Sequence, residues 1–313
     1  KVREVLILSG VNLAARKNVF NGEKRCQVEN QYIQVERNEN GVVTITLNAP
    51  EQLNAWYIPL MEEMTTELDY IKSNTEDRVV IFTGAGRAFS SGGDVSAFQQ
   101  GENQPIPHFM KEKKDRARGG WNVPTMDSEE RLKNEPFNGR RIHMQIYNLD
   151  KPTIAAVNGV AAGAGCDLAL ACDIRLASRD ARFIEVYVRR GLIPLDGGAF
   201  WAPFHLPHGI AMQMLFTGEA LNAEDAFKFG LVNSVHEKEE LMPASLELAN
   251  KIAKGPPVTQ QLTKHMIREF HLEMFKHHWD LVDKASAHIR ETRDFDEGIS
   301  SFMEKRAPEF KGF

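Results

Sequence analysis

The sequence predicts an α/β fold, in which strands and helices alternate along the chain. Residues 32–47 read as a hairpin, because YIQVER and VVTITL are rich in β-forming residues and flank the turn sequence NENG. Residues 54–73 place apolar side chains at helical spacing, and RVVIFT at 78–83 has the composition of a buried strand. A strand, a helix and a further strand in this order favour a right-handed crossover and parallel pairing.

The composition is that of a globular protein. The 313 residues are 42% hydrophobic and 26% charged, which suits one large domain or one domain with an appendage. The net charge of -5 and the pI near 6.1 give no reason to expect nucleic acid or an anionic membrane as a partner. No apolar run reaches the roughly 18–20 residues that a membrane span requires.

The cysteines and the N-terminal residues bear on the cellular compartment in which the protein is expected to be found. Cys26, Cys166 and Cys172 form no CxxC pair, so we expect reduced thiols that pack in the core, and a cytoplasmic location. Residues 1–28 match no later pattern, and their apolar piece VLIL is followed by no recognisable signal-peptide cleavage pattern. They are predicted to be an N-terminal extension.

The stretch from Ile154 to Ala177 is the one around which we expect the molecule to be organised. Its first four residues suit a buried strand, and Asn158 and Gly159 give a turn signal. An Ala- and Leu-rich buried helix is predicted to begin near Gly163.

The start of this helix is suited to hold a developing negative charge. Its first amides have no partner within the helix and carry the positive end of the dipole, which places free donors near Ala164 and Gly165. Asp167 follows at once, and because a carboxylate is costly to bury in an apolar helix, it is a candidate catalytic group. Two other interpretations stay open: a buried structural acid, and a dinucleotide fingerprint that would need glycine where Leu168 stands.

A second candidate region is the loop AFSSGGD at residues 88–94. Ser90 stands two residues before Gly92, as in a nucleophile elbow, but that motif needs glycine where Ala88 stands. We therefore expect Gly92 and Gly93 to act through exposed backbone amides, with serine hydrolysis as the alternative.

The remaining segments are assigned from their patterns. Residues 98–127 contain Pro, Gly and many charges and are predicted to form a mobile loop or lid, whose run KEKKDRAR either meets phosphates or is a solvated charge run. Helical character resumes at 137–148, and after Ala177 come a short strand, a turn and a Gly-rich helix start. From about His208 the chain is predicted to be helical, with a last helix over 258–287. No metal site is predicted, because the histidines of that helix lack the HExxH spacing: His265, His271, His277 and His278.

Six motifs together resemble a known family. In chain order they are PEQLNA (50–55), AFSSGGD (88–94), PTIAAVNGVAAGAGCDLALACDIRLAS (152–178), GLIPLDGG (191–198), LFTGEALNAEDAFKFGLVNSV (215–235) and EGISSFMEKRAPEF (297–310). They resemble the crotonase superfamily, also called the enoyl-CoA hydratase and isomerase family, over roughly residues 30–313. The resemblance implies a core of repeated ββα turns and a helical C-terminal region that mediates trimer formation, often as a dimer of trimers (a hexamer). We accordingly expect the N-terminal extension at 1–28, the core with an acyl-CoA site at 29–207 and the helical region at 208–313.

The resemblance also implies a chemistry. Members of the family bind an acyl-CoA thioester and stabilise its enolate with two backbone amides, with no cofactor beyond the coenzyme A of the substrate. By motif position those amides belong to Gly93 and Ala164, which would form an oxyanion hole.

The acid and base positions depart from the family's standard pair of glutamates. Asp167 stands at the first position, as in some isomerases of the family, and Tyr187 stands at the second, which puts ordinary two-glutamate water addition in doubt. Other branches place an acid near Asp196, which could share the proton transfers with Asp167 while Tyr187 orients water or donates a proton. A helix N-cap is the alternative for Asp196. Glu185, on a regular strand, would share a face with Tyr187 and could only partly substitute for the missing glutamate.

Four further residues are expected to bind substrate: Ser91 and Asp94 in the first loop, Gly165 in the helix start and Lys305 in the tail. Lys305 resembles a residue that reaches the nucleotide part of CoA from a neighbouring subunit. The segment PEQLN has Gln52 where the family often has a basic side chain.

The leading functional hypothesis is hydration or double-bond isomerisation of an unsaturated acyl-CoA, linear or cyclic, with proton transfer centred on Asp167. Within the enzyme class, the alternative is hydrolysis or carbon–carbon cleavage of a β-oxo or cyclic acyl-CoA. A noncatalytic CoA- or RNA-binding protein is the alternative from another class, although the acidic net charge disfavours RNA.

Overall fold

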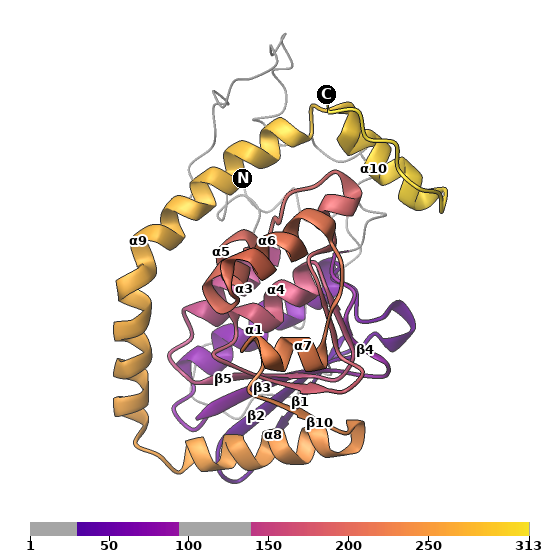
Figure 1. The fold of residues 1–313 in the computed structure, drawn as a ribbon. Coiled ribbons are helices and arrows are strands. Elements are labelled where there is room, and N and C mark those ends of the chain that lie inside the picture. Colours follow the sequence, from indigo (N-terminus) through magenta and orange to yellow (C-terminus); the bar gives the residue numbers. More distant parts are fainter. Residues whose placement is uncertain (1–29, 94–138, 313) are drawn as a thin grey trace, which may run out of the picture. The chain divides into compact units, whose positions relative to one another are not determined.

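The computed structural model describes residues 30–93 and 139–312 (Figure 1). The predicted N-terminal extension, the predicted lid, Cys26 and Asp94 lie outside these ranges. Contacts group Gln31–Phe313 into one compact unit. The predicted boundary between the core and the helical C-terminal region stays a prediction.

The main sheet has six strands. In spatial order they are β1 (Ile33–Arg37), β2 (Val42–Leu47), β3 (Val79–Gly84), β5 (Thr153–Val157), β7 (Ile174–Ser178) and β10 (Ser234–His236). β1 and β2 form the predicted antiparallel hairpin, and every neighbouring pair from β2 to β10 is parallel. The helix α1 (Ile58–Ser73) connects β2 to β3, so the predicted strand, helix and parallel strand are confirmed.

A second sheet has four short strands. In spatial order they are β4 (Ala88–Ser90), β6 (Val160–Ala162), β8 (Arg182–Ile184) and β9 (Leu221–Asn222). β4, β6 and β8 follow β3, β5 and β7 directly in the chain, so each pass of the chain adds one strand to each sheet. This repetition, with helices between the passes, confirms the predicted α/β class with its repeated ββα turns.

Helices fill the rest of the described chain. They are α3 (Gly139–Tyr147), α4 (Ala164–Ala171), α5 (Gly198–His205), α6 (His208–Thr217), α7 (Ala223–Lys228), α8 (Lys238–Ala253), α9 (Pro257–Ile289) and α10 (Arg293–Met303). The C-terminal region is mainly helical as predicted, but β9 and β10 come from it and join the two sheets. Within the described ranges, no helix combines the length and the apolar character that crossing a membrane requires.

Two element boundaries differ from the sequence-based expectation. The helix expected from residue 54 begins at Ile58, because the chain first makes a 3-10 turn at Pro50–Gln52 and then passes through left-handed conformations at Leu53 and Asn54. The central buried helix ends at Ala171, and the last part of the stretch that we expected to organise the molecule is the strand β7.

Both faces of the main sheet are covered. Val79 and Ile81 of β3 pack with α8, whereas Val80 and Phe82 face the larger cluster that includes α1, α3 and α4 (Figure 1). This two-sided burial explains why the segment RVVIFT is continuously apolar rather than alternating. All eight residues of α4 are buried.

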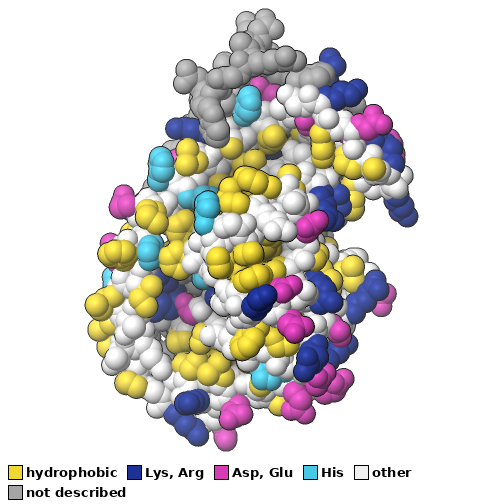
Figure 2. Space-filling model, viewed as in Figure 1, with side chains coloured by type: hydrophobic (Ala, Val, Ile, Leu, Met, Phe, Trp, Pro, Cys, Tyr) yellow, Lys and Arg dark blue, Asp and Glu magenta, His cyan; other side chains and the backbone are white. Residues whose placement is uncertain are grey.

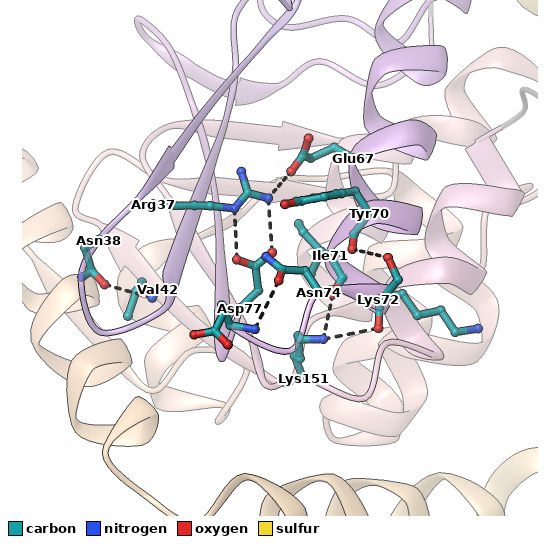
Figure 3. A network of polar contacts seen from close by, with 12 residues as sticks. Arg37, Asn38, Val42, Glu67, Tyr70, Ile71, Lys72, Asn74, Asp77 and Lys151 are labelled. Carbon is teal, nitrogen blue, oxygen red and sulfur yellow. Dashed lines mark hydrogen bonds and ion pairs between the residues drawn. The ribbon is translucent and has the colours of Figure 1, made fainter. Parts of the chain in front are cut away.

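A network of polar contacts ties the end of α1 to the first strand (Figure 3). Arg37 donates to both carboxylate oxygens of Asp77, at 3.0 and 3.2 Å, and also to Glu67 on α1. Nearby, Lys151 donates to the carbonyl of Ile71 at 2.7 Å, where a cation complements the C-terminal end of the helix dipole. Burial lowers the pKa of Lys151. The network holds β1, α1 and the chain leading into β5 together.

The last helix touches the core backbone to backbone. A 3-10 turn at Val186–Arg190, labelled η5, is followed by Gly191, and a methyl group on Gly191 would lie 2.3 Å from the carbonyl oxygen of Asp294 on α10. On the α10 side, a methyl group on Gly298 would lie 2.2 Å from the carbonyl of Arg190. Both contacts need glycine, so α10 is fitted closely onto η5.

Candidate active site

The two predicted oxyanion segments lie against each other. Gly92, in the loop after β4, has a φ of 87°, and a methyl group on it would lie 2.4 Å from the carbonyl oxygen of Ala162 and 3.2 Å from the amide nitrogen of Ala164. Only glycine fits such a conformation and such a close approach without strain. The loop therefore lies on the start of α4, as the motif positions imply.

The segment PEQLNA holds this loop in place. Asn54 is fully buried, and its side-chain amide donates to the carbonyls of Ala85 and Ala88 at 3.0 and 2.8 Å. The Trp56 amide then donates to the carbonyl of Gly92 at 2.8 Å. Ser90 donates in turn to the carbonyl of Asn54 at 2.8 Å. Because Ser90 is fully buried and bonded in this way, it is a structural residue here and not an exposed nucleophile.

Two backbone N–H groups at this junction have no acceptor among the described residues. They belong to Gly93, which is exposed, and to Ala164, the first residue of α4. Gly163, which precedes Ala164, has a positive φ of 50°, and the position of its missing Cβ lies 3.8 Å from the Tyr187 hydroxyl. Free donors, the positive end of a buried helix and a tyrosine hydroxyl thus meet at one place.

The structure brings together the three predicted catalytic residues. The Tyr187 hydroxyl lies 2.6 Å from Asp167 Oδ2 and 3.1 Å from Asp196 Oδ2. Asp167 and Tyr187 are buried, whereas Asp196 is half-buried. Burial, and then the neighbouring carboxylates of Glu185 and Asp196, raises the pKa of Asp167 well above its usual range. Burial also raises the pKa of the Tyr187 phenol.

Glu185 is a fourth acid at the same place. Its side chain is 1% exposed, and burial raises its pKa to about 8. The Cys166 thiol lies beside it as a weak donor, and neither carboxylate oxygen accepts a hydrogen bond from nitrogen or oxygen within the described ranges. The expectation that Glu185 lies on a regular strand is wrong, because β8 ends at Ile184 and Glu185 is the N-cap residue that precedes the 3-10 turn η5.

The N-cap alternative for Asp196 is also wrong. The residue that caps α5 is Gly197, in a left-handed conformation and without a side-chain capping bond. The Asp196 carboxylate instead contacts Tyr187.

Three of the four predicted substrate-binding residues lie within the described ranges, each in a different segment of the chain. Ser91 is half-buried, and its hydroxyl lies 3.4 Å from the Gln52 carbonyl. Gly165 faces Ser90, because a methyl group on it would lie 2.5 Å from the Ser90 carbonyl oxygen, so packing alone already requires glycine there. Lys305 follows α10, is exposed, and is the farthest in sequence from the loop. For these three residues, and for Asp94 outside the described ranges, a binding role stays a prediction.

One pair at the site was missed by the sequence reasoning. Trp56 stacks on His143 of α3, with ring centroids 4.9 Å apart, and His143 Nε2 donates to the Ala164 carbonyl at 3.0 Å. The pair links the Gly92 loop to the first turn of α4. Trp56 lies just after the PEQLNA motif, but it is 87 positions from His143 in the sequence, so no local pattern reports their contact. Cys166 and Cys172 are free and buried, as predicted. Among the described residues, no cluster of His, Cys, Asp or Glu is arranged to hold a metal ion.

The fold and the comparison with known proteins together identify the class of this protein and its family. The repeated ββα passes, with the buried Asp167 in the first turn of a core helix, place the chain among α/β proteins with a candidate acid–base site. The chain matches the enoyl-CoA hydratase/isomerase family over residues 37–118 and 119–312, and it belongs to this family, the crotonase superfamily. It is therefore an acyl-CoA enzyme of the hydratase or isomerase type.

Similar proteins include both reaction types. The chain is 34% identical over 269 residues to the short-chain-enoyl-CoA hydratase of Clostridium acetobutylicum, covering 86% of this chain and 93% of that protein. It is 32% identical over 274 residues to the 1,2-epoxyphenylacetyl-CoA isomerase of Escherichia coli, and the match covers 88% of this chain and 96% of that protein. Among solved structures, the carnitinyl-CoA hydratase from Mycobacterium avium is 30% identical with a TM-score of 0.74, covering 90% of this chain and 99% of that one.

Proposed function

We propose that the protein binds the thioester oxygen of an unsaturated acyl-CoA between the N–H groups of Gly93 and Ala164, and that Asp167, Tyr187 and Asp196 move the protons. The observation that carries the proposal is the junction of two partner-free N–H groups with a hydroxyl that contacts two carboxyl groups. Donors already aimed at a developing enolate oxygen lower the barrier without reorganisation, typically by about 3 kcal/mol for each donor.

Two carboxyl groups suit isomerisation of a double bond. One removes a proton from a carbon of the acyl chain, and the other returns a proton to a different carbon of the same enolate. The absence of a glutamate at position 187 argues against the standard two-glutamate addition of water. Hydration by a water molecule held at Asp196, which is half-buried, is the other outcome that the same site supports.

Binding of the CoA arm is assigned to Ser91, Asp94, Gly165 and Lys305, with Lys305 acting on the substrate of a neighbouring subunit. No cofactor is needed beyond the coenzyme A of the substrate. A cytoplasmic location also stays a prediction.

A homotrimer or a dimer of trimers is the expected assembly. On α9 a row of apolar side chains, spaced four residues apart, is 57–84% exposed: Val258, Leu262, Met266, Phe270 and Met274. Figure 2 shows hydrophobic and histidine side chains along the edge where Figure 1 places α9. An apolar row of this length on a helix surface is suited to packing against another copy of the chain.

Turnover assays test the proposed function. The purified protein is incubated with linear enoyl-CoA and with cyclic oxoacyl-CoA, and isomerisation, hydration, ring opening and release of free CoA are followed separately. We expect isomerisation or hydration, and a loss of about 10²- to 10⁴-fold in kcat for Asp167→Asn. Asp180→Asn, at an exposed carboxyl, is the matched control and should retain full activity.

Three other outcomes would contradict the proposed function. Release of free CoA or ring opening would replace the proposal by hydrolysis or carbon–carbon cleavage. Full activity of the Asp167→Asn variant would remove Asp167 from the chemistry. Salt-sensitive RNA binding without turnover of any acyl-CoA would point to the noncatalytic class.

A further inference from the structure

Glu185 is a buried carboxyl group to which the proposed function gives no part. It faces Asp167 across the start of α5: the position of a Cβ on Gly198 lies 2.3 Å from Glu185 Oε2 and 2.8 Å from Asp167 Oδ1. Asp167 Oδ1 has no hydrogen-bond partner within the described ranges, and neither Glu185 oxygen accepts a hydrogen bond from nitrogen or oxygen there. Gly198 leaves the space between the two acids empty of side chain.

No cation neutralises this pair in the part of the chain that the structure describes. The titratable groups that act on it are Cys166 of α4, Tyr187 of η5 and Asp196 of the turn before α5. α5 itself presents only Gly198 at this point. Two carboxyl groups in such a site cannot both be ionised, because each charge opposes the other at short range and in a low dielectric.

The Tyr187 contacts show which group of the site holds a proton. A hydroxyl has a single proton, so Tyr187 cannot donate to Asp167 and to Asp196 at once. Both contacts, at 2.6 and 3.1 Å, are hydrogen bonds if one carboxyl is protonated and donates to the tyrosine oxygen. Because burial disfavours a charged carboxylate, the buried Asp167 is the acid better suited to hold that proton and to donate it to the Tyr187 oxygen.

We propose that Glu185 is a positioning residue that ionises before Asp167 as the pH rises, and that its negative charge then keeps the proton on Asp167. The inference rests on the proposed function, because it gives the hydrogen-bonded chain from Asp167 through Tyr187 to Asp196 a fixed direction. Asp196 is then the base and Asp167 the acid. Glu185 acts through Asp167 and does not touch the substrate.

The proton balance closes in this arrangement. Asp196 takes a proton from the acyl chain, the C–H bond breaks, and its electron pair forms the enolate. Asp167 gives its proton to the remote carbon of the enolate and becomes a carboxylate. Tyr187 then passes its proton to Asp167 and receives the proton from Asp196, which restores the starting state.

The test is the pH dependence of kcat/KM for isomerisation by the wild type and by Glu185→Gln. In Glu185→Gln the charge beside Asp167 is absent, so Asp167 loses its proton at lower pH. The alkaline limb of the kcat/KM profile of this variant should therefore lie at a pH lower by about one unit or more than that of the wild type. Glu185→Asp, which keeps a carboxyl group, should restore part of the wild-type profile. Cys172→Ala, which removes a buried thiol that acts on neither acid, is the control and should leave the limb in place. An unchanged limb in Glu185→Gln would overturn the proposal.

Infrared spectroscopy gives a second measurement that needs no turnover. The carbonyl stretch of a protonated carboxyl group is followed against pH in the wild type, Glu185→Gln and Asp167→Asn. We expect a band that persists at alkaline pH in the wild type, disappears at lower pH in Glu185→Gln and is missing at alkaline pH in Asp167→Asn. A band that survives in Asp167→Asn and is lost in Glu185→Gln would place the proton on Glu185 and refute the inference. A wild type without turnover would instead count against the proposed function, while the infrared result still decides the role of Glu185.

Discussion

Neighbouring glycines of the first loop have different physical roles. Gly92 has a positive φ and lies against the backbone of Ala162. Apart from its chain neighbours, no atom of the described residues lies within 4 Å of the position that a Cβ on Gly93 would take. Gly92 is therefore needed for the fold of the loop. It is buried and its N–H group donates to the Ser90 hydroxyl at 3.2 Å, so the expectation that Gly92 acts through an exposed amide is wrong. Gly93 is the residue whose N–H group is proposed to bind the thioester oxygen.

The two alanine substitutions should differ in stability. Gly92→Ala combines a strained conformation with a contact of 2.4 Å to a carbonyl oxygen, so we expect it to lower the free energy of unfolding by about 1–3 kcal/mol or more. Gly93→Ala is the matched control and should unfold like the wild type. Chemical denaturation measures both. An equal decrease in the free energy of unfolding of the two variants would contradict the packing described for this loop.

At the scale of single elements, the long helix α9 offers the clearest test. Its exposed apolar row is suited to a contact between subunits, so a charge at its centre should oppose association. Phe270, which is 84% exposed, is the best position because its replacement removes little packing within the chain.

We expect Phe270→Glu to shift the protein from the proposed trimer or hexamer toward monomer, as measured by light scattering coupled to size-exclusion chromatography. The unfavourable burial of a carboxylate at an interface provides the driving force. Glu269→Gln, one residue away and outside the row, should keep the assembly of the wild type. A Phe270→Glu variant of unchanged mass would place the subunit contact elsewhere.

At the scale of the whole molecule, buried acids make stability depend on pH. The pKa of Glu185 is raised to about 8 in the folded protein, from about 4.5 in an unfolded chain. The folded state thus binds more protons between these values, and the free energy of unfolding falls as the pH rises from 4.5 through 8.

Glu185→Gln should flatten this dependence by on the order of 2 kcal/mol, because the amide does not titrate. Denaturation curves at pH 5 and pH 8.5 measure the effect, with Glu39→Gln at an exposed position as the control. A stability of the wild type that rises over this range would contradict the raised pKa.

Much of this fold was predictable from local pattern. The hairpin, the strand β3, the helices α1 and α9 and the start of α4 follow from periodicity and turn residues. The short strands β6, β9 and β10 were not expected, because a segment of two or three residues is too short to show the alternation of apolar and polar side chains that is typical of a strand. Their pairing is decided by the neighbouring passes of the chain.

The candidate site was predictable where motifs carried it. Asp167, Tyr187 and Asp196 are together in space, as their motif positions implied, and Gly92 lies on Ala164. The proximity of Glu185 to Asp167 does not follow from the sequence pattern, because residues 185–187 read as a strand whereas the chain turns there into η5. The stack of Trp56 on His143 joins distant segments, and no local signal reports such a contact.

The close fit of α10 on η5 has a consequence for recombination between relatives. The turn that carries Tyr187 and the helix near the C-terminal end meet through Gly191 and Gly298, each of which leaves no room for a side chain. A chimera that takes its final helix from another family member would need small residues at both places. Otherwise a graft made more than 100 positions downstream would displace Tyr187 from its place in the site.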